Sequence, residues 1–238
     1  MILSKKLQAE WRPRRRFRAL SFDGVDDYVE VPHASSLDLN TEVTFLAFVK
    51  PSSRCLGTYK NIIEKSGASP IMWINPNSKP YFGAVVDGLF KKAVSPIAIE
   101  MDKWHLLGGY ALSNGTTTEI GTIVDIGVVE TTTFSGSLSV STYPILIGID
   151  YAKNEDYYFV GKIAMMFIYN CVLNDTEIKQ LNDNPFNPPR PENLVLWLAP
   201  GSIDTGAGKW YDLSQYGNHG TIYGAQVVEE AVREVIVK

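Results

Sequence analysis

Carboxylates are the side chains of this sequence with the clearest capacity for chemistry. Asp23, Asp26 and Asp27 lie close together, and carboxylate oxygens are the ligands that calcium prefers. Aspartates in a tight turn also accept hydrogen bonds from nearby backbone N–H groups, and the spacing lacks the full signature of a calcium loop. The pattern therefore favours a hydrogen-bonded turn, with calcium as the one cofactor that these residues could hold.

Hydrolysis of a glycosidic bond would require two carboxylates about 5–9 Å apart, which on one face of a strand means acids at positions i and i+2 or i+4. The closest approximation is Glu155-Asp156, in a tyrosine-rich stretch that is typical of a loop. The three histidines are scattered, without the His/Cys clusters of a zinc site, and no Gly-x-Ser-x-Gly motif accompanies them. We therefore predict no catalytic residues and a protein that is not an enzyme.

Aromatic side chains indicate a different function, the binding of a sugar. Sugar rings stack on aromatic faces, and a few amides or carboxylates then hydrogen-bond to the hydroxyl groups. Aromatic residues also fill the cores of β-proteins, and residue type alone does not separate the two roles. We predict a ligand-binding surface from aromatic residues in the turn-rich parts of the chain, namely Trp73, Tyr81, Tyr151, Tyr157 and Tyr158.

A basic segment at the N-terminus is the third candidate site. Residues 1–20 carry a net charge of +6 and the whole chain carries −4, which leaves −10 on the remaining residues. Such a segment could contact an acidic neighbouring subunit, nucleic acid or an anionic lipid surface, or it could be a solvated tail. Nucleic acid is expected as a partner only through this basic arm, whose arginines are Arg12, Arg14, Arg15, Arg16 and Arg18.

The same part of the chain argues against a signal peptide, and hydropathy argues against a transmembrane segment. Arginines occupy the positions where a secretory signal would need an apolar stretch, so no signal peptide is predicted. No apolar run approaches the roughly 20 residues needed to cross a bilayer, so no transmembrane segment is expected. Cys55 and Cys171 could form one disulfide, but their positions favour two free thiols.

Composition predicts an all-β protein. The 238 residues are 45% hydrophobic and 11% aromatic, with 19 Gly and 13 Pro, which suits strands and turns around a core. One helix is expected over residues 174–182, because Asn174 is a typical N-cap and Glu177 completes a capping box. Strands are predicted over residues 20–22, 28–31, 43–49, 61–64, 71–74, 81–86, 104–111, 120–126, 128–133, 144–149, 162–169 and 194–198, while residues 227–237 could form a strand or a short helix.

Several motifs then occur in a familiar order. The segment 19–32, which contains Phe22-Asp23-Gly24, resembles the opening motif of the laminin-G-like, concanavalin A-like lectin/glucanase jelly-roll superfamily. Trp104-His105, Ile147-Gly148 and Gly161-Lys162-Ile163 resemble its later landmarks, and the likeness covers roughly residues 19–225. The resemblance implies a two-sheet antiparallel jelly-roll sandwich, and calcium use as in many laminin-G-like domains. The Glu-x-Asp-x-x-Glu-like string of the retaining glycosidases in this superfamily is missing from the sequence.

Three departures from the family pattern stand out. Ala164 follows the Gly-Lys-Ile motif where relatives usually carry an acid, and the hairpin after Trp104-His105 extends over residues 114–129. The segments 194–198 and 210–221 resemble sequence that normally precedes the Phe-Asp-Gly motif, yet here they come last. Circular permutation within one chain is favoured over pairing with a neighbouring subunit, because intrachain closure costs less entropy.

This order suggests four parts of the chain. They are a basic arm at 1–18, a laminin-G-like β-sandwich at 19–183, a proline-rich connector at 184–192, and C-terminal strands at 193–238 that complete the same sandwich or a neighbouring one. We predict a non-enzymatic structural and binding protein of a virion (capsid, decoration or tail component) or another extracellular or cell-surface assembly, self-associating and binding surface glycans. The alternative is a stand-alone carbohydrate- or protein-binding adhesion module, and a glycoside hydrolase is a distant third.

Overall fold

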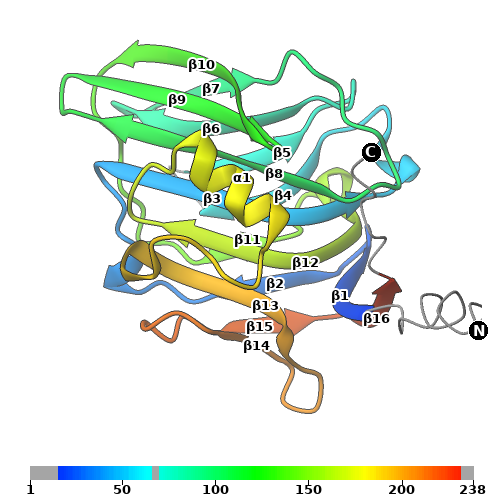
Figure 1. Cartoon of the computed structure of the whole chain (residues 1–238). Coiled ribbons are helices and arrows are strands. Elements are labelled where there is room, and N and C mark those ends of the chain that lie inside the picture. The colour runs from blue at the N-terminus through cyan, green and yellow to red at the C-terminus, as the bar shows by residue number, and fades with distance from the viewer. Residues whose placement is uncertain (1–15, 66–69, 232–238) are drawn as a thin grey trace, which may run out of the picture.

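The computed structural model describes residues 16–65 and 70–231, and these form an antiparallel β-sandwich. The prediction of an all-β jelly roll with one short helix is confirmed. In the front layer of Figure 1, the strands lie in the order β10, β9, β8, β3 and β12, and both β1 and β13 then pair with the free edge of β12. Their bounds are β1 Arg16–Asp23, β3 Glu42–Pro51, β8 His105–Ser113, β9 Thr117–Val124, β10 Gly127–Ser135, β12 Val160–Tyr169 and β13 Leu194–Asp204.

The second layer lies behind the first in Figure 1 and follows the order β15, β2, β11, β4, β5, β6 and β7. The two layers are parts of one continuous sheet, because β14 (Lys209–Asp212) pairs with both β13 and β15. A shift in register between Leu198 and Ile203 marks the place where β13 turns from one layer toward the other. The strands of this layer are β2 Tyr28–Val31, β4 Lys60–Lys65, β5 Ile71–Ile74, β6 Pro80–Val86, β7 Leu89–Val94, β11 Ile145–Ile147 and β15 Gly220–Tyr223.

Two apolar cores hold the layers and the helix in place. The larger core fills the space between the layers, where Phe45, Phe82 and Trp210 are fully buried. The smaller core lies between the front layer and helix α1 (Asp175–Asp183), which contributes Ile178 and Leu181. Asn174 accepts a hydrogen bond from the backbone N–H of Glu177 and the Glu177 carboxylate accepts one from Asn174, so the predicted capping box is present.

The C-terminal strands pair with earlier strands of the same chain. β13 pairs with β12, β15 pairs with β2, and β16 (Gln226–Ala231) pairs with β1. The sequence analysis allowed either a strand or a short helix over residues 227–237, and the described part of this segment is a strand. None of the described helices is long and apolar enough to cross a membrane. Cys55 and Cys171 are both buried and unpaired, in agreement with the favoured free thiols.

β7 is a strand that the sequence analysis missed. Lys91 and Lys92 interrupt its apolar residues, and they are tolerated because β7 lies at an edge of the sheet where their side chains reach solvent. The preceding Asp87-Gly88, both with positive φ, forms the tight turn from β6. The long hairpin expected over residues 114–129 is instead divided by a second turn at Asp125-Ile126, which separates β9 from β10.

We expect His105 on β8 to make stability depend on pH. Its Nδ1 lies 3.1 Å from Asp125 Oδ2 and its Nε2 lies 3.0 Å from the Glu100 carbonyl oxygen, and both partners are acceptors that the protonated ring satisfies. Burial lowers the pKa of His105, but Asp125 and the Glu100 carbonyl raise it more, so the pKa lies above its ordinary 6.5. The resulting stabilisation is complete below pH 6.5 and is lost as the pH rises through the raised pKa.

Denaturant unfolding of the natural protein and of His105→Gln from about pH 5 to about pH 9 checks this expectation. The free energy of unfolding should differ most between the two proteins at the acid end, and the difference should shrink at the alkaline end. Asp125→Asn keeps the His105 ring but removes its charged partner. In a protein that carries this substitution, His105→Gln should change the free energy of unfolding at the acid end by less. A gap that stays constant over the whole pH range would contradict the assignment.

Candidate functional site

The outer face of the second layer carries the candidate site. On β5, Met72 and Ile74 point into the core, so the alternate residues Ile71 and Trp73 lie on the opposite, outer face. The register places Trp73 opposite Tyr81 of β6 and Glu64 of β4 opposite Ile71. Neighbouring strands thus bring side chains that are distant in sequence onto one surface.

A hollow of about 300 Å³ lies on this face, and we call it the Glu64 pocket. Phe90 and Tyr151 are among its lining residues and are 47% and 49% exposed. Phe90 lies over Gly83, where a Cβ atom would meet its ring at 2.5 Å, so this glycine lets the ring approach the sheet. The pocket is lined by Glu64, Ile71, Val85, Phe90, Asp150, Tyr151 and Ala152.

An aromatic cluster of Tyr59, Trp73, Tyr81 and Tyr157 adjoins Glu64, with Trp73 on β5, Tyr81 on β6, Tyr59 just before β4 and Tyr157 at the end of the short 3-10 helix Glu155–Tyr157. The Trp73 ring lies 4.8 Å from Tyr157, 6.2 Å from Tyr59 and 6.3 Å from Tyr81 between centroids. Tyr59 is 38% exposed, whereas Tyr81 is only 5% exposed, because Lys92 extends over its ring with Nζ 4.7 Å from the centroid. The cluster therefore presents Tyr59 outward and packs Tyr81 as support.

The Glu64 pocket holds two carboxyl groups, of which Glu64 is only partly ionised at neutral pH. Burial and the negative charge of Asp150 together raise the pKa of Glu64 to about 7, against the lowering effect of hydrogen bonds from the Tyr151 backbone N–H and the Asn61 amide. Burial also raises the pKa of Asp150, which accepts a hydrogen bond from the Asn154 backbone N–H at 2.8 Å. Within the described residues, neither carboxylate forms an ion pair. The pocket thus combines two aromatic walls with two carboxylates that lack a cationic partner.

A sequence profile described as the concanavalin A-like lectin/glucanases superfamily, of the laminin G type, matches residues 23–179. The chain belongs to this superfamily. No curated protein matches the sequence. Several solved structures share the fold of this chain at low sequence identity.

Three solved structures illustrate that likeness. A Bacteroides ovatus protein that has been proposed to bind carbohydrate superposes with a TM-score of 0.69 at 15% identity over 91% of this chain, which spans 61% of that protein. A serum amyloid P-like pentraxin of Limulus polyphemus gives 0.57 at 13% identity, over 90% of this chain and 95% of its own. Domain 4 of the arabinanase AbnA from Geobacillus stearothermophilus, solved with arabinotriose, gives 0.55 at 15% identity, over 69% of this chain and 76% of its own.

The ligand residues predicted from sequence are distributed unevenly in this laminin G-type fold. Tyr151 lines the Glu64 pocket, and Trp73, Tyr81 and Tyr157 form the aromatic cluster beside Glu64. Tyr158 is 7% exposed and packs in a separate small apolar group with Leu146 and Ile149. The structure therefore brings four of the five predicted residues to one face and places Tyr158 beneath the surface.

Sequence reasoning missed Glu64, Phe90 and Asp150. Phe90 is the second residue after the Asp87-Gly88 turn, and recognising that hairpin would have placed Phe90 on a strand. Glu64 and Asp150 are separated by 86 positions, and the pairing of β4 with β11, which precedes Asp150, brings their segments together. No local pattern indicates that pairing.

The predicted calcium residues form a structured turn in this superfamily member. Carboxylate oxygens of Asp23, Asp26 and Asp27 all lie within 4.8 Å of one another, so the group has a donor set that suits calcium. Two of the carboxylates already serve the turn, since Asp27 Oδ2 accepts from the Asp23 N–H and Asp23 Oδ1 accepts from the Val25 N–H, both at 2.8 Å. Burial raises the pKa of Asp27. These bonds fit the turn that the sequence favoured, and calcium stays a prediction.

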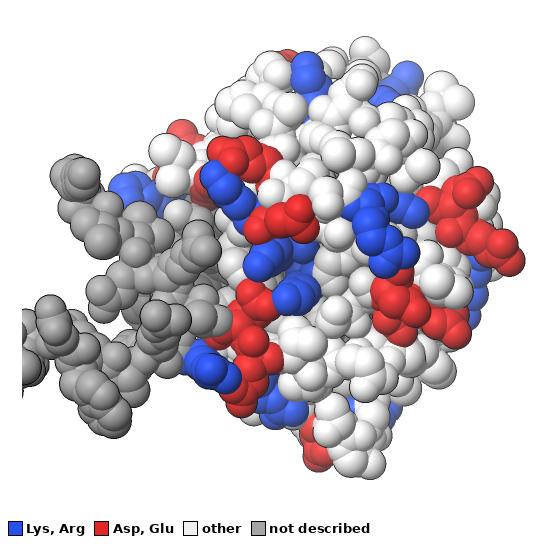
Figure 2. Space-filling view, turned by 90° about the vertical axis from the view of Figure 1, so that its right-hand side faces the viewer, with Lys and Arg blue, Asp and Glu red and all other residues white. Residues whose placement is uncertain are grey.

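The described part of the basic arm belongs to the sheet. β1 begins at Arg16, which pairs with Glu229 at 3.0 Å, and Arg18 Nη1 donates to the Ile203 carbonyl at 2.8 Å. Figure 2 shows acidic and basic side chains interspersed on the face it presents, without a large area of one sign. Arg12, Arg14 and Arg15 lie outside the described residues, so contact with nucleic acid or an acidic neighbour stays a prediction.

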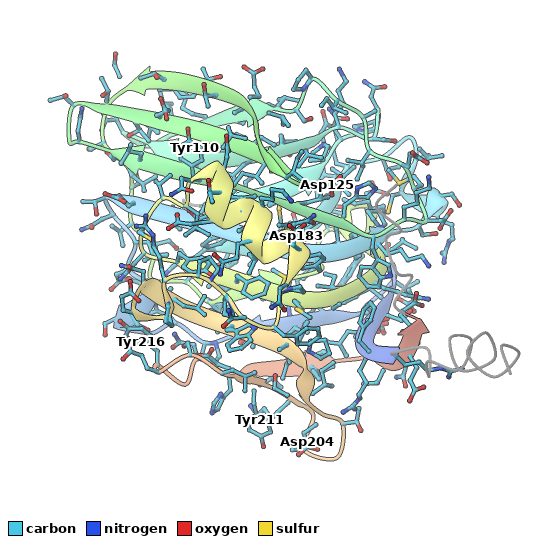
Figure 3. The ribbon with its side chains drawn as sticks, in the orientation of Figure 1. Tyr110, Asp125, Asp183, Asp204, Tyr211 and Tyr216 are labelled. Atoms are coloured by element: carbon cyan, nitrogen blue, oxygen red, sulfur yellow. The ribbon has the colours of Figure 1, made fainter. Side chains whose placement is uncertain are left out.

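Exposed tyrosines also occur away from the Glu64 pocket. Figure 3 shows Tyr211 and Asp204 at the lower edge of the molecule and Tyr216 at its left. Tyr211 and Asp204 line a second hollow of about 470 Å³, together with Arg18. Its lining contains one aromatic side chain, so it cannot hold a sugar ring between two aromatic faces. Tyr216, 42% exposed, lines neither hollow and provides a matched control for variants of the site.

Proposed function

We propose that this chain is a non-catalytic carbohydrate-binding module that takes a glycan residue in the Glu64 pocket. The observation that carries the proposal is the pairing of exposed aromatic walls, Phe90 and Tyr151, with two carboxylate acceptors, the half-buried Glu64 and the buried Asp150. The apolar face of a sugar ring packs on aromatic side chains, and its hydroxyl groups donate to carboxylates. Tyr59, on the adjoining aromatic cluster, offers contact to a second sugar residue.

The comparisons add support at the level of the fold. The Bacteroides ovatus protein has been proposed to bind carbohydrate, and the AbnA domain was solved with arabinotriose. Jelly rolls of this superfamily can thus carry sugar-binding surfaces, although fold alone does not assign a ligand. Function at an extracellular or cell surface, where glycans are abundant, is part of the proposal.

Truncation of either aromatic wall should weaken glycan binding. We expect Phe90→Ala and Tyr151→Ala each to reduce affinity about 3- to 10-fold, because an aromatic stacking contact contributes about 0.5–1.5 kcal/mol. Binding of the full chain is first found on a glycan array and then measured by titration calorimetry on the best ligand. Tyr216→Ala removes an equally exposed tyrosine outside the pocket and should leave affinity unchanged.

Two outcomes would overturn the proposal. Equal loss of affinity in Phe90→Ala and Tyr216→Ala would place the ligand elsewhere. Release of reducing ends from a bound polysaccharide would show catalysis, for which a carboxyl of pKa about 7 beside a second carboxyl is a suitable acid. Loss of that release in Glu64→Gln would then identify Glu64 as the acid.

A role as a subunit of a virion or another extracellular assembly remains a prediction beside this proposal. It requires that the full chain associates with itself or with other subunits. Mass-resolved size-exclusion chromatography of the full chain tests it directly. A stable monomer would contradict self-assembly and would leave the glycan-binding module as the function of the isolated chain.

A further inference from the structure

We infer that the Glu64 pocket selects a glycan residue that carries a free, protonated amine, which is to say an amino sugar. This inference rests on the proposed function and names its ligand class. It follows from three features of the pocket: its acceptors, the surrounding lysines and its apolar walls.

Apart from the hydroxyl group of Tyr151, the polar side chains that line the pocket are hydrogen-bond acceptors. Glu64 and Asp150 supply carboxylates, and Asn61 Nδ2 donates to Glu64 Oε2 at 2.8 Å. Asn61 is fully buried and is not part of the pocket lining, so the side-chain acceptors that a ligand can reach are the carboxylates of Glu64 and Asp150 and the Tyr151 hydroxyl. Acceptors gathered in this way favour a ligand group that carries several N–H donors and a positive charge.

The nearby lysines do not neutralise these carboxylates. Each lysine of the adjoining strands and loop that the structure describes is directed to another partner. Lys91 and Lys92 of β7 lie over the rings of Phe134 and Tyr81, and Lys153 Nζ donates to the Tyr28 hydroxyl. On β4, Lys60 Nζ donates to the Asp156 carbonyl and Lys65 Nζ lies 3.9 Å from Asp38. In the sequence, positions 66–69 between β4 and β5 read Ser-Gly-Ala-Ser and carry no charge.

The walls of the pocket distinguish an amino sugar from a bare cation. Ile71, Val85 and Phe90 offer no oxygen ligand, and a divalent ion such as calcium needs six or more. A sugar ring with an ammonium substituent uses both kinds of surface, because its apolar face packs on Phe90 or Tyr151 while the amine reaches the carboxylates. An anionic sugar would meet repulsion from the same two groups.

The test measures the affinity of the full chain for the two members of matched ligand pairs by titration calorimetry near neutral pH. The pairs are the methyl glycosides of glucosamine, galactosamine and mannosamine, each against its N-acetylated form, which keeps the ring and removes the charge. We expect at least one free amine to bind about tenfold tighter than its N-acetylated partner, and added salt to reduce the preference. Calcium chloride is titrated separately.

Variants then assign the preference to Glu64. Glu64→Gln should abolish the preference for the free amine while retaining binding of the neutral form, and its melting temperature should not fall, because burial of the charge is unfavourable. Glu130→Gln on β10, in the other layer, makes the same charge change and should keep the preference.

The outcomes separate this inference from the proposed function. Equal affinity for all three amines and their N-acetylated forms, or tighter binding of the acetylated ones, would overturn the amino-sugar inference while the glycan-binding module stands. Binding of no glycan on the array would overturn both. Saturable binding of calcium that Glu64→Gln abolishes would identify a metal site instead, and would also overturn the inference.

Discussion

A chain that ends at Pro189 is expected to have no cooperative fold. It would lack β13 to β16, which form one edge of the front layer, the connection between the layers, and the strand beside β2. The same segment supplies core residues between the layers, including the fully buried Trp210, whose indole N–H donates to the Ala199 carbonyl at 2.9 Å. The core side chains lost with it are Val195, Leu196, Leu198, Ile203, Trp210 and Ala225.

The free energy lost with these core side chains is large enough to unfold the whole domain. Each buried Val, Leu or Ile contributes about 1.5–3 kcal/mol, and a whole domain is stable by only about 5–15 kcal/mol. Near-ultraviolet circular dichroism and urea unfolding of residues 1–189 should show no fixed aromatic environment and no sigmoidal transition. Addition of a separate 190–238 peptide, which restores the missing strands, is the control. A cooperative transition in the shortened chain without the peptide would mean that the first part of the chain folds alone.

Gly109→Ala should strongly destabilise the sandwich although it adds only one methyl group. A Cβ atom at Gly109 of β8 would overlap Phe82 from the other layer and the Gly121 carbonyl oxygen of the adjacent strand. The backbone of β9 cannot move aside without breaking its ladder with β8. We expect a loss of about 3 kcal/mol or more, and a fall in melting temperature of roughly 5–10 °C.

The matched control is Gly201→Ala, since a Cβ atom at Gly201 meets nothing within 4 Å. Thermal unfolding of both variants separates the effect of close packing from the general effect of replacing a glycine. Similar melting temperatures for the two variants would show that β6 and β8 can separate by enough to admit a methyl group. The Phe82 ring would then be less tightly held than its full burial indicates.

The elements most accessible to sequence reasoning are those with local signals. The helix follows from Asn174 and Glu177, whose reciprocal hydrogen bonds form within four residues of chain. The predicted strand over residues 71–74 has the same bounds in the structure, because its apolar residues are followed at once by turn-forming ones. β7 has only four apolar residues in six and two adjacent lysines, so its local pattern resembles a loop as much as a strand.

The candidate site is less predictable because burial and pairing, rather than residue type, select its members. Tyr151 and Tyr158 are the same residue type seven positions apart, yet one lines the Glu64 pocket and the other is packed beneath the surface. Glu64 acquires its raised pKa from burial and from Asp150, and both depend on the arrangement of β4 and β11. Glutamate in a predicted strand gives no sign of such a neighbour.

The pairing of β1 with β16 determines how the domain would respond to mechanical force. Arg16 lies opposite Ala231, so the two ends of the described chain leave the sheet side by side from an antiparallel pair. Tension between the ends would load the hydrogen bonds of that pair one after another, as a zipper opens, instead of all together in shear. A chain pulled from both ends would therefore yield first at this edge and at low force, while β1 stays attached to β12 through Leu20 to Asp23.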